Sequence, residues 1–214
     1  MLEDIKKIER HTFRHGFEDG IFEIVFGAFF LLHGLYFIVL GLTPKMSVRF
    51  FAPVIGYLLL IFLGFLLFKK AMRSLKEKWA WPRTGYVSYR ESRQSRLKAG
   101  IRGGIAGFCT PIAIDLIKAI FSKTIPIFSP FTVISGFLFA AFFFWLGLRS
   151  GLVRFAFVGG ISAAVGLICS LLTMNRNYSM SIFFSGIGIV LIAGGWIASR
   201  RFLHSHPLPA EDPR

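Results

Sequence analysis

The sequence predicts an all-α polytopic membrane helix bundle with six transmembrane helices and both termini in the cytoplasm. Of the 214 residues, 54% are hydrophobic, and they come in long blocks rather than in short amphipathic runs. Six of these blocks approach the length of about 20 residues that a helix needs to cross a bilayer. The basic residues gather between alternate blocks, which is how a membrane protein encodes its orientation.

The six apolar blocks divide the chain into spans and connecting segments. The expected spans are Gly20–Leu42, Phe50–Phe68, Gly104–Phe121, Phe131–Leu148, Phe155–Thr173 and Ser181–Ser199. The third span is the weakest, because it contains Pro111, Asp115 and Lys118. The division is therefore a cytoplasmic amphipathic helix (1–19), two spans (20–68), a basic cytoplasmic loop (69–103), four spans (104–199) and a cytoplasmic tail (200–214).

The distribution of charge predicts the orientation of the chain. If the N-terminus is cytoplasmic, 20 of the 25 Lys and Arg residues fall in cytoplasmic segments. The first 19 residues are charged and of mixed sign, so they do not form a cleavable signal peptide. The net charge of +14 is explained by this orientation signal. We therefore expect lipid, with anionic lipids at the cytoplasmic face, and no nucleic acid as a partner.

Small residues predict where the helices pack, because close backbone approach replaces the hydrophobic effect inside a bilayer. The first span carries Gly20, Gly27, Gly34 and Gly41 at a strict seven-residue spacing. Each heptad drifts by only about 20° around a helix, so the four glycines form one packing stripe. The fifth and sixth spans also carry paired small residues and are expected to form a close antiparallel pair.

The basic segment 69–103 contains the most distinctive string of the chain, WPRTGYVSYR. A helix is expected to continue from the second span and to break at Trp81–Pro82, because the residue before a proline avoids helical angles. Aromatic residues near arginines are typical of the membrane interface, and they also suit an anionic ligand. The candidate contacts to an anionic lipid or ligand are Arg83, Tyr86, Tyr89 and Arg90.

This string resembles a "PRTGYV" element of uncharacterised prokaryotic multi-pass membrane proteins. The resemblance covers about ten residues, from Trp81 to Arg90. It implies a similar polytopic fold and a location in a prokaryotic cytoplasmic membrane. It implies no activity.

Four ionisable or polar residues fall inside the expected spans, where such groups are costly and mark functional sites. They are Glu23, His33, Asp115 and Lys118. One interpretation is a proton or cation path through Glu23, His33 and Asp115. The alternative is structural: Glu23 binds a basic cytoplasmic residue, His33 binds a carbonyl, and Asp115 pairs with Lys118 one turn away.

The sequence contains no signature of catalysis or of a bound cofactor. There is no GxSxG, P-loop, dinucleotide fingerprint or CxxC, and five histidines are too few for a diiron centre. We therefore expect no enzyme activity, no cofactor and no metal. Two functions remain: a non-catalytic accessory, scaffold or assembly protein with a membrane-protein partner, or a small homo-oligomeric transporter.

Overall fold

A computed structural model describes residues 13–14, 16–42, 51–84, 130–172 and 175–207. Five helices in these ranges are long and apolar enough to cross a membrane, and the same ranges contain no strand. The described part of the chain is therefore all-helical, with apolar helices suited to a bilayer. The expected span Gly104–Phe121 lies outside the described residues.

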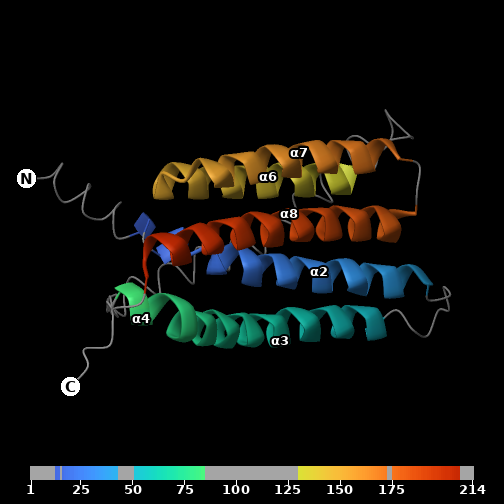
Figure 1. Ribbon diagram of the computed structural model, residues 1–214. Helices are drawn as coiled ribbons and strands as arrows, with labels where there is room; N and C mark the ends of the chain where they lie inside the picture. Colours follow the sequence, from blue (N-terminus) through green and yellow to red (C-terminus); the bar gives the residue numbers. More distant parts are fainter. Residues whose placement is uncertain (1–12, 15, 43–50, 85–129, 173–174, 208–214) are drawn as a thin grey trace, which may run out of the picture.

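The five long helices lie side by side, as Figure 1 shows. Helices α2 (Ile21–Leu42) and α8 (Arg176–Ser205) form the centre, and α3 (Phe51–Leu75) lies along α2. The hairpin of α6 (Pro130–Ser150) and α7 (Val153–Leu171) covers the other side of α8. Helix α3 is the most peripheral, and most of its apolar side chains are exposed on the outside of the bundle.

The two ends of the bundle differ in charge. One end, here called the basic end, holds the start of α2, the end of α3, the α6–α7 turn and the end of α8. Of the Lys and Arg residues that the structure describes, only Arg176 lies at the opposite end. This asymmetry is the pattern that orients helices in a membrane.

The glycine stripe of α2 lies against α8 along its whole length. A Cβ atom built at Gly20 would lie 2.3 Å from the carbonyl oxygen of Gly195, and one built at Gly27 would lie 2.7 Å from that of Gly188. Gly34 meets Ser181 and Ser185, and Gly41 meets the ring of Tyr178. The small residues Ser181, Gly188 and Gly195 repeat every seven positions on α8, so the two antiparallel stripes keep the same register.

The α6–α7 hairpin is closed by a turn of two residues, Gly151 and Leu152. Gly151 has a φ of 71°, a left-handed conformation that glycine adopts without strain. Its N–H donates to the carbonyl oxygen of Gly147 at 2.8 Å, which ends α6. At the other end of the hairpin, Gly136 and Gly166 touch through their backbones.

The expected helix break at Trp81–Pro82 is wrong. Helix α3 continues through a π-helical turn, Lys76–Ala80, into α4 (Trp81–Thr84). The N–H of Trp81 donates to the carbonyl oxygen of Lys76, five residues back. A proline in a regular helix clashes with the carbonyl four residues before it. The wider turn immediately before Pro82 lets the helix pass through the proline.

The expected pairing of the last two spans also needs correction. Helices α7 and α8 touch, but α7 packs more extensively against α6, and α8 against α2. The reason lies in which small residues face which helix. Gly159 lies against the carbonyl of Ala140 on α6, and Gly188 and Gly195 lie against α2.

Phenylalanine side chains fill the core between α2, α6 and α8. Phe30 of α2 lies 4.9 Å from Phe139 of α6 and 5.5 Å from Phe184 of α8, measured between ring centroids, and both contacts are edge-to-face. Such contacts add about 0.5–1.5 kcal/mol each beyond the area they bury. The cluster includes the buried residues Phe143, Phe155 and Phe183.

Candidate functional site

Glu23 lies in the first turn of α2, at the basic end of the bundle, and is only 2% exposed. Asp19, just before the helix, is equally buried. Gly20 joins them with a φ of 70°, so the chain turns sharply between the N-terminal segment and α2. The Oδ1 atom of Asp19 accepts a hydrogen bond from the N–H of Ile21 at 3.0 Å, which satisfies one of the free donors at the helix start.

Arg154 of α7 provides the positive charge opposite Glu23. Its Nε lies 2.7 Å from Oε1 of Glu23, and its Nη2 donates to the carbonyl oxygen of Phe17. The tight Gly151–Leu152 turn starts α7 immediately before Arg154, which brings the guanidinium to the start of α2. The pair thus joins α7 to α2 and to the N-terminal segment.

Lys76 joins α3 to the same cluster. It lies on the π-helical turn, and its Nζ donates to the carbonyl oxygen of Gly16 at 2.7 Å. The same Nζ lies 3.5 Å from Oδ2 of Asp19. Two acidic and two basic side chains therefore balance each other where α2, α3 and α7 meet. A buried charge of this kind is tolerated only when it is paired.

Burial raises the pKa of the Asp19 carboxyl above its ordinary value of 3.8. The positive charge of Lys76 and the hydrogen bond from Ile21 act in the opposite direction, and they only partly offset the effect of burial on the pKa. Asp19 therefore binds a proton more tightly in the folded protein than in an unfolded chain.

The carboxylate of Glu23 is incompletely satisfied. The Nε–H of Arg154 is close to Oε1 but is not aligned as a hydrogen bond, and neither Glu23 oxygen has a hydrogen-bond donor among the described residues. A buried carboxylate normally accepts several hydrogen bonds. The Glu23 carboxylate is therefore held mainly by its charge interaction with Arg154.

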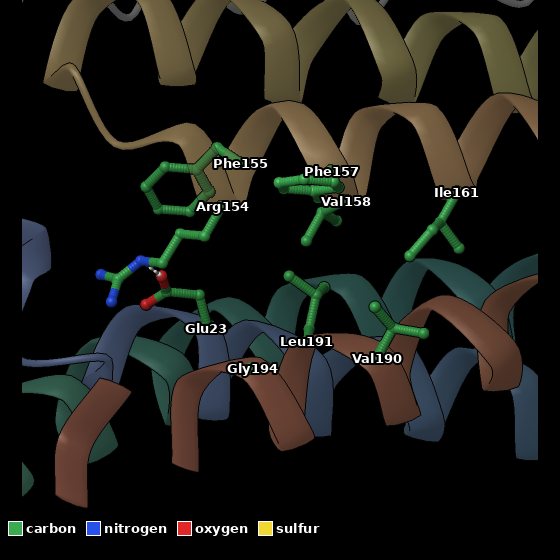
Figure 2. A pocket seen from close by; sticks show the side chains of 9 residues that line it. All are labelled: Glu23, Arg154, Phe155, Phe157, Val158, Ile161, Val190, Leu191 and Gly194. Carbon is green, nitrogen blue, oxygen red and sulfur yellow. Dashed lines mark ion pairs between the residues drawn. The ribbon is translucent and has the colours of Figure 1, made fainter. Parts of the chain in front are cut away.

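Glu23 and Arg154 line one end of a pocket between α7 and α8, drawn in Figure 2. The pocket has a volume of about 170 Å³. All its other walls are apolar: Phe155, Phe157, Val158, Ile161, Val190, Leu191 and Gly194. Phe157 is 71% exposed on the outer face of the helices, so the pocket opens toward the side that lipid contacts. Of its lining residues only Glu23 and Arg154 ionise, and both Glu23 oxygens are buried, so the pocket presents an almost wholly apolar surface.

His33 lies deeper in α2 and is separate from this cluster. Its Nδ1 is 2.8 Å from the carbonyl oxygen of Phe29, one turn earlier on the same helix. Its ring is surrounded by aromatic rings, with centroid distances of 4.3 Å to Phe29 and 5.7 Å to both Tyr57 and Phe184. These contacts match the structural interpretation of His33, namely a buried ring that binds a carbonyl.

Arg83 lies at the end of α8 rather than in the pocket. Its Nη1 donates to the carbonyl oxygens of His206 at 2.7 Å and of Leu203 at 3.3 Å. A positive charge at this position interacts favourably with the negative end of the α8 helix dipole. The other candidate contacts, Tyr86, Tyr89 and Arg90, lie outside the described residues, as do Asp115 and Lys118.

Sequence analysis did not single out Asp19, Lys76 or Arg154. Asp19 and Arg154 lie at the edges of apolar blocks and Lys76 lies in the basic segment 69–103, and charged residues are ordinary at such positions. The available signal was the cost of burying Glu23, which requires a basic partner, but many basic residues were available. Comparisons of the chain with known protein families, curated proteins and solved structures find no match.

Proposed function

We propose that this protein is a non-catalytic membrane protein that acts as an accessory subunit, scaffold or assembly factor for a membrane-protein partner. One observation carries the proposal: Glu23 is paired with Arg154 and reaches a pocket whose other walls are apolar. A transport path for a proton or cation needs polar groups or water along its length. From Glu23 inward, the pocket is lined by apolar side chains such as Val158, Ile161 and Leu191 instead.

The tight packing of the bundle also supports a scaffold. Helices α2 and α8 meet through glycines and serines, so a rocking movement between them would break many backbone contacts at once. Alternating access requires such a movement of one bundle part against another. A rigid core with a wide apolar exterior suits a protein that holds a partner or lipids.

We propose six spans with both termini in the cytoplasm of a prokaryote. Helix α4, which continues α3, lies beside the end of α8 through Arg83, whereas α6 begins beside the end of α7, at the opposite end of the bundle. The segment 85–129 must therefore join opposite ends, and its apolar block Gly104–Phe121 has the length of one crossing. The basic end would face the cytoplasm.

Native mass spectrometry of the protein extracted from its own membrane tests the proposed role. A partner present in fixed stoichiometry is the expected result. A homo-oligomer without a partner, together with ion flux in vesicles that Glu23→Gln abolishes, would instead establish the transporter. The matched control for flux is Glu77→Gln, because Glu77 is exposed and lies in a surface ion pair with Arg73.

Single cysteines test the proposed topology in a background without Cys109 and Cys169. A membrane-impermeant maleimide applied to intact cells should label Asn175→Cys but not Ser205→Cys. Asn175 precedes α8 at the opposite end, and Ser205 ends α8 at the basic end. Labelling of Ser205→Cys from outside would reverse the orientation.

A further inference from the structure

We infer that the outer face of α8, at the basic end of the bundle, binds the phosphate of one anionic phospholipid. Arg200 and Arg201 would hold the phosphate, and Trp196 and Ile197 would lie against the upper part of an acyl chain. This site differs from the candidate contacts around Arg83, whose guanidinium already binds the end of α8. It goes beyond the proposed role of the protein and holds for a scaffold and a transporter alike.

The two arginines lie where the apolar part of α8 ends. A Cβ atom built at Gly20 would lie 2.9 Å from both the Cβ atom of Ala198 and the backbone nitrogen of Ser199. Gly20 separates the charged residues before α2 from the apolar residues within it. Arg200 and Arg201 therefore begin at the depth at which both central helices change from apolar to charged. In a helix that spans a bilayer, this is the depth of the lipid headgroups.

Arg200 and Arg201 have no anionic partner within the described part of the chain. Its four acidic residues each pair with another cation: Glu18 with Arg14, Asp19 with Lys76, Glu23 with Arg154 and Glu77 with Arg73. Helix α8 contains no acidic residue, and no ion pair among the described residues includes Arg200 or Arg201. Two adjacent exposed cations without a counter-charge attract an anion from outside.

The side chains one turn earlier on α8 complete the site. The guanidinium carbon of Arg200 lies 5.2 Å from the centroid of the Trp196 ring. This cation–π contact restricts the position of the guanidinium, whose N–H groups remain available for a phosphate. Arg201 lies four residues after Ile197 and therefore on the same side of the helix. Trp196 is 48% exposed and Ile197 is 53% exposed, so an acyl chain can lie against both from the bilayer.

The charge of the headgroup selects among lipids that share the same phosphate. Phosphatidylcholine carries a positive choline beside its phosphate, and the two arginines repel that charge. Phosphatidylglycerol carries the phosphate without a cation, so its net negative charge is attracted to the arginines. Free inorganic phosphate offers similar oxygens, but it has no acyl chain to bury against the apolar side chains.

The test is a titration of the delipidated full-length protein with phosphatidylglycerol and phosphatidylcholine of identical acyl chains, followed by native mass spectrometry. We expect phosphatidylglycerol to bind with a Kd about tenfold lower than phosphatidylcholine, the scale of one or two favourable charge interactions at a membrane surface. The double variant Arg200→Gln, Arg201→Gln should lose most of this preference. Inorganic phosphate at the concentration of the lipid should not displace phosphatidylglycerol.

A second double variant, Lys69→Gln, Lys70→Gln, is the matched control. It removes the same charge from another adjacent pair of exposed cations, at the end of the apolar part of α3. No tryptophan lies one turn before this pair. The control should keep the preference for phosphatidylglycerol, because the charge that it removes is outside the site.

An equal loss of preference in the two double variants would overturn the site, since it would show a general attraction to the basic end. Equal affinity of the unmodified protein for both lipids would overturn the selection by charge. Displacement by inorganic phosphate would overturn the lipid as the ligand. A photoreactive residue in place of Ile197 identifies the neighbour directly. A lipid adduct supports the proposal, whereas an adduct only with residues 85–129, with residues 208–214 or with a second copy of the chain overturns it.

Discussion

Gly27 of α2 and Gly188 of α8 face each other with no room for a side chain on either. A Cβ atom at Gly27 would lie 2.7 Å from the carbonyl oxygen of Gly188, and one at Gly188 would lie 2.8 Å from that of Gly27. The obstacle on each side is backbone, which cannot rotate away. The distance between the two central helices is therefore set by the absence of these two side chains.

Gly27→Ala should destabilise the protein by about 1–3 kcal/mol, the usual cost of inserting a methyl group into a closely packed site. The control is Gly194→Ala on α8, where an added Cβ atom meets open space and alanine favours the helix. Thermal unfolding in detergent, followed by fluorescence-detected size exclusion, measures both. Equal Tm values for the two variants would contradict the close glycine contact.

Arg154→Gln should destabilise the protein more than Glu23→Gln does. Removing the guanidinium leaves a buried carboxylate without a cation, a loss of about 3–5 kcal/mol. Removing the carboxylate leaves an arginine that is partly exposed and still bound to the carbonyl of Phe17. The double variant should recover part of the loss. Additive effects of the two substitutions in denaturant or thermal unfolding would show that the two side chains do not interact.

The raised pKa of Asp19 predicts how the stability of the protein depends on pH. Its pKa is raised above 3.8 in the folded protein, so the folded state binds the proton more tightly than the unfolded chain does. The tighter proton binding by Asp19 stabilises the folded protein fully below pH 3.8, the ordinary pKa of the side chain. This stabilisation is lost as the pH rises through the raised pKa of the folded state. Relative to Asp19→Asn, the unmodified protein should therefore lose stability as the pH rises from about 4.

The measurement is the Tm of both proteins across this pH range, and only their difference matters, since all other acidic groups are common to both. A difference that is constant with pH would mean that Lys76 and the Ile21 N–H cancel the effect of burial on the pKa of Asp19, and a difference that changes in the opposite direction would mean that they outweigh it.

Arg83→Gln should loosen the last turn of α8. The substitution removes two charge-assisted hydrogen bonds to the carbonyls of Leu203 and His206, each typically about 1.5–3 kcal/mol. Hydrogen exchange should become faster at the amides of the last turn of α8, while the centre of α8 stays unchanged. Lys78→Gln removes an exposed charge from the preceding π-helical turn and serves as the control. If the amides of the last turn of α8 exchange at the same rate in both variants, Arg83 does not stabilise this turn.

Long-range features of the fold could be predicted only where the sequence carries a repeated pattern. The glycines of α2 predicted a packing stripe, and the same spacing of Ser181, Gly188 and Gly195 on α8 would have identified its partner. The pairing of α7 with α6 had a weaker signal. Gly159 and Gly166, seven residues apart on α7, both face α6, but a Cβ atom at the adjacent Gly160 would meet open space.

The sequence by itself determined that apolar helices form, which end of the bundle is basic and which residues of α2 allow close packing. These features depend on the transfer of apolar side chains from water to lipid and on the spacing of residues within one helix. Both are properties of each segment by itself. Only the tertiary structure decided that Glu23 meets Arg154, that Asp19 meets Lys76 and that the helix passes through Pro82. Those outcomes depend on which surfaces meet when the helices pack, and no single segment contains that information.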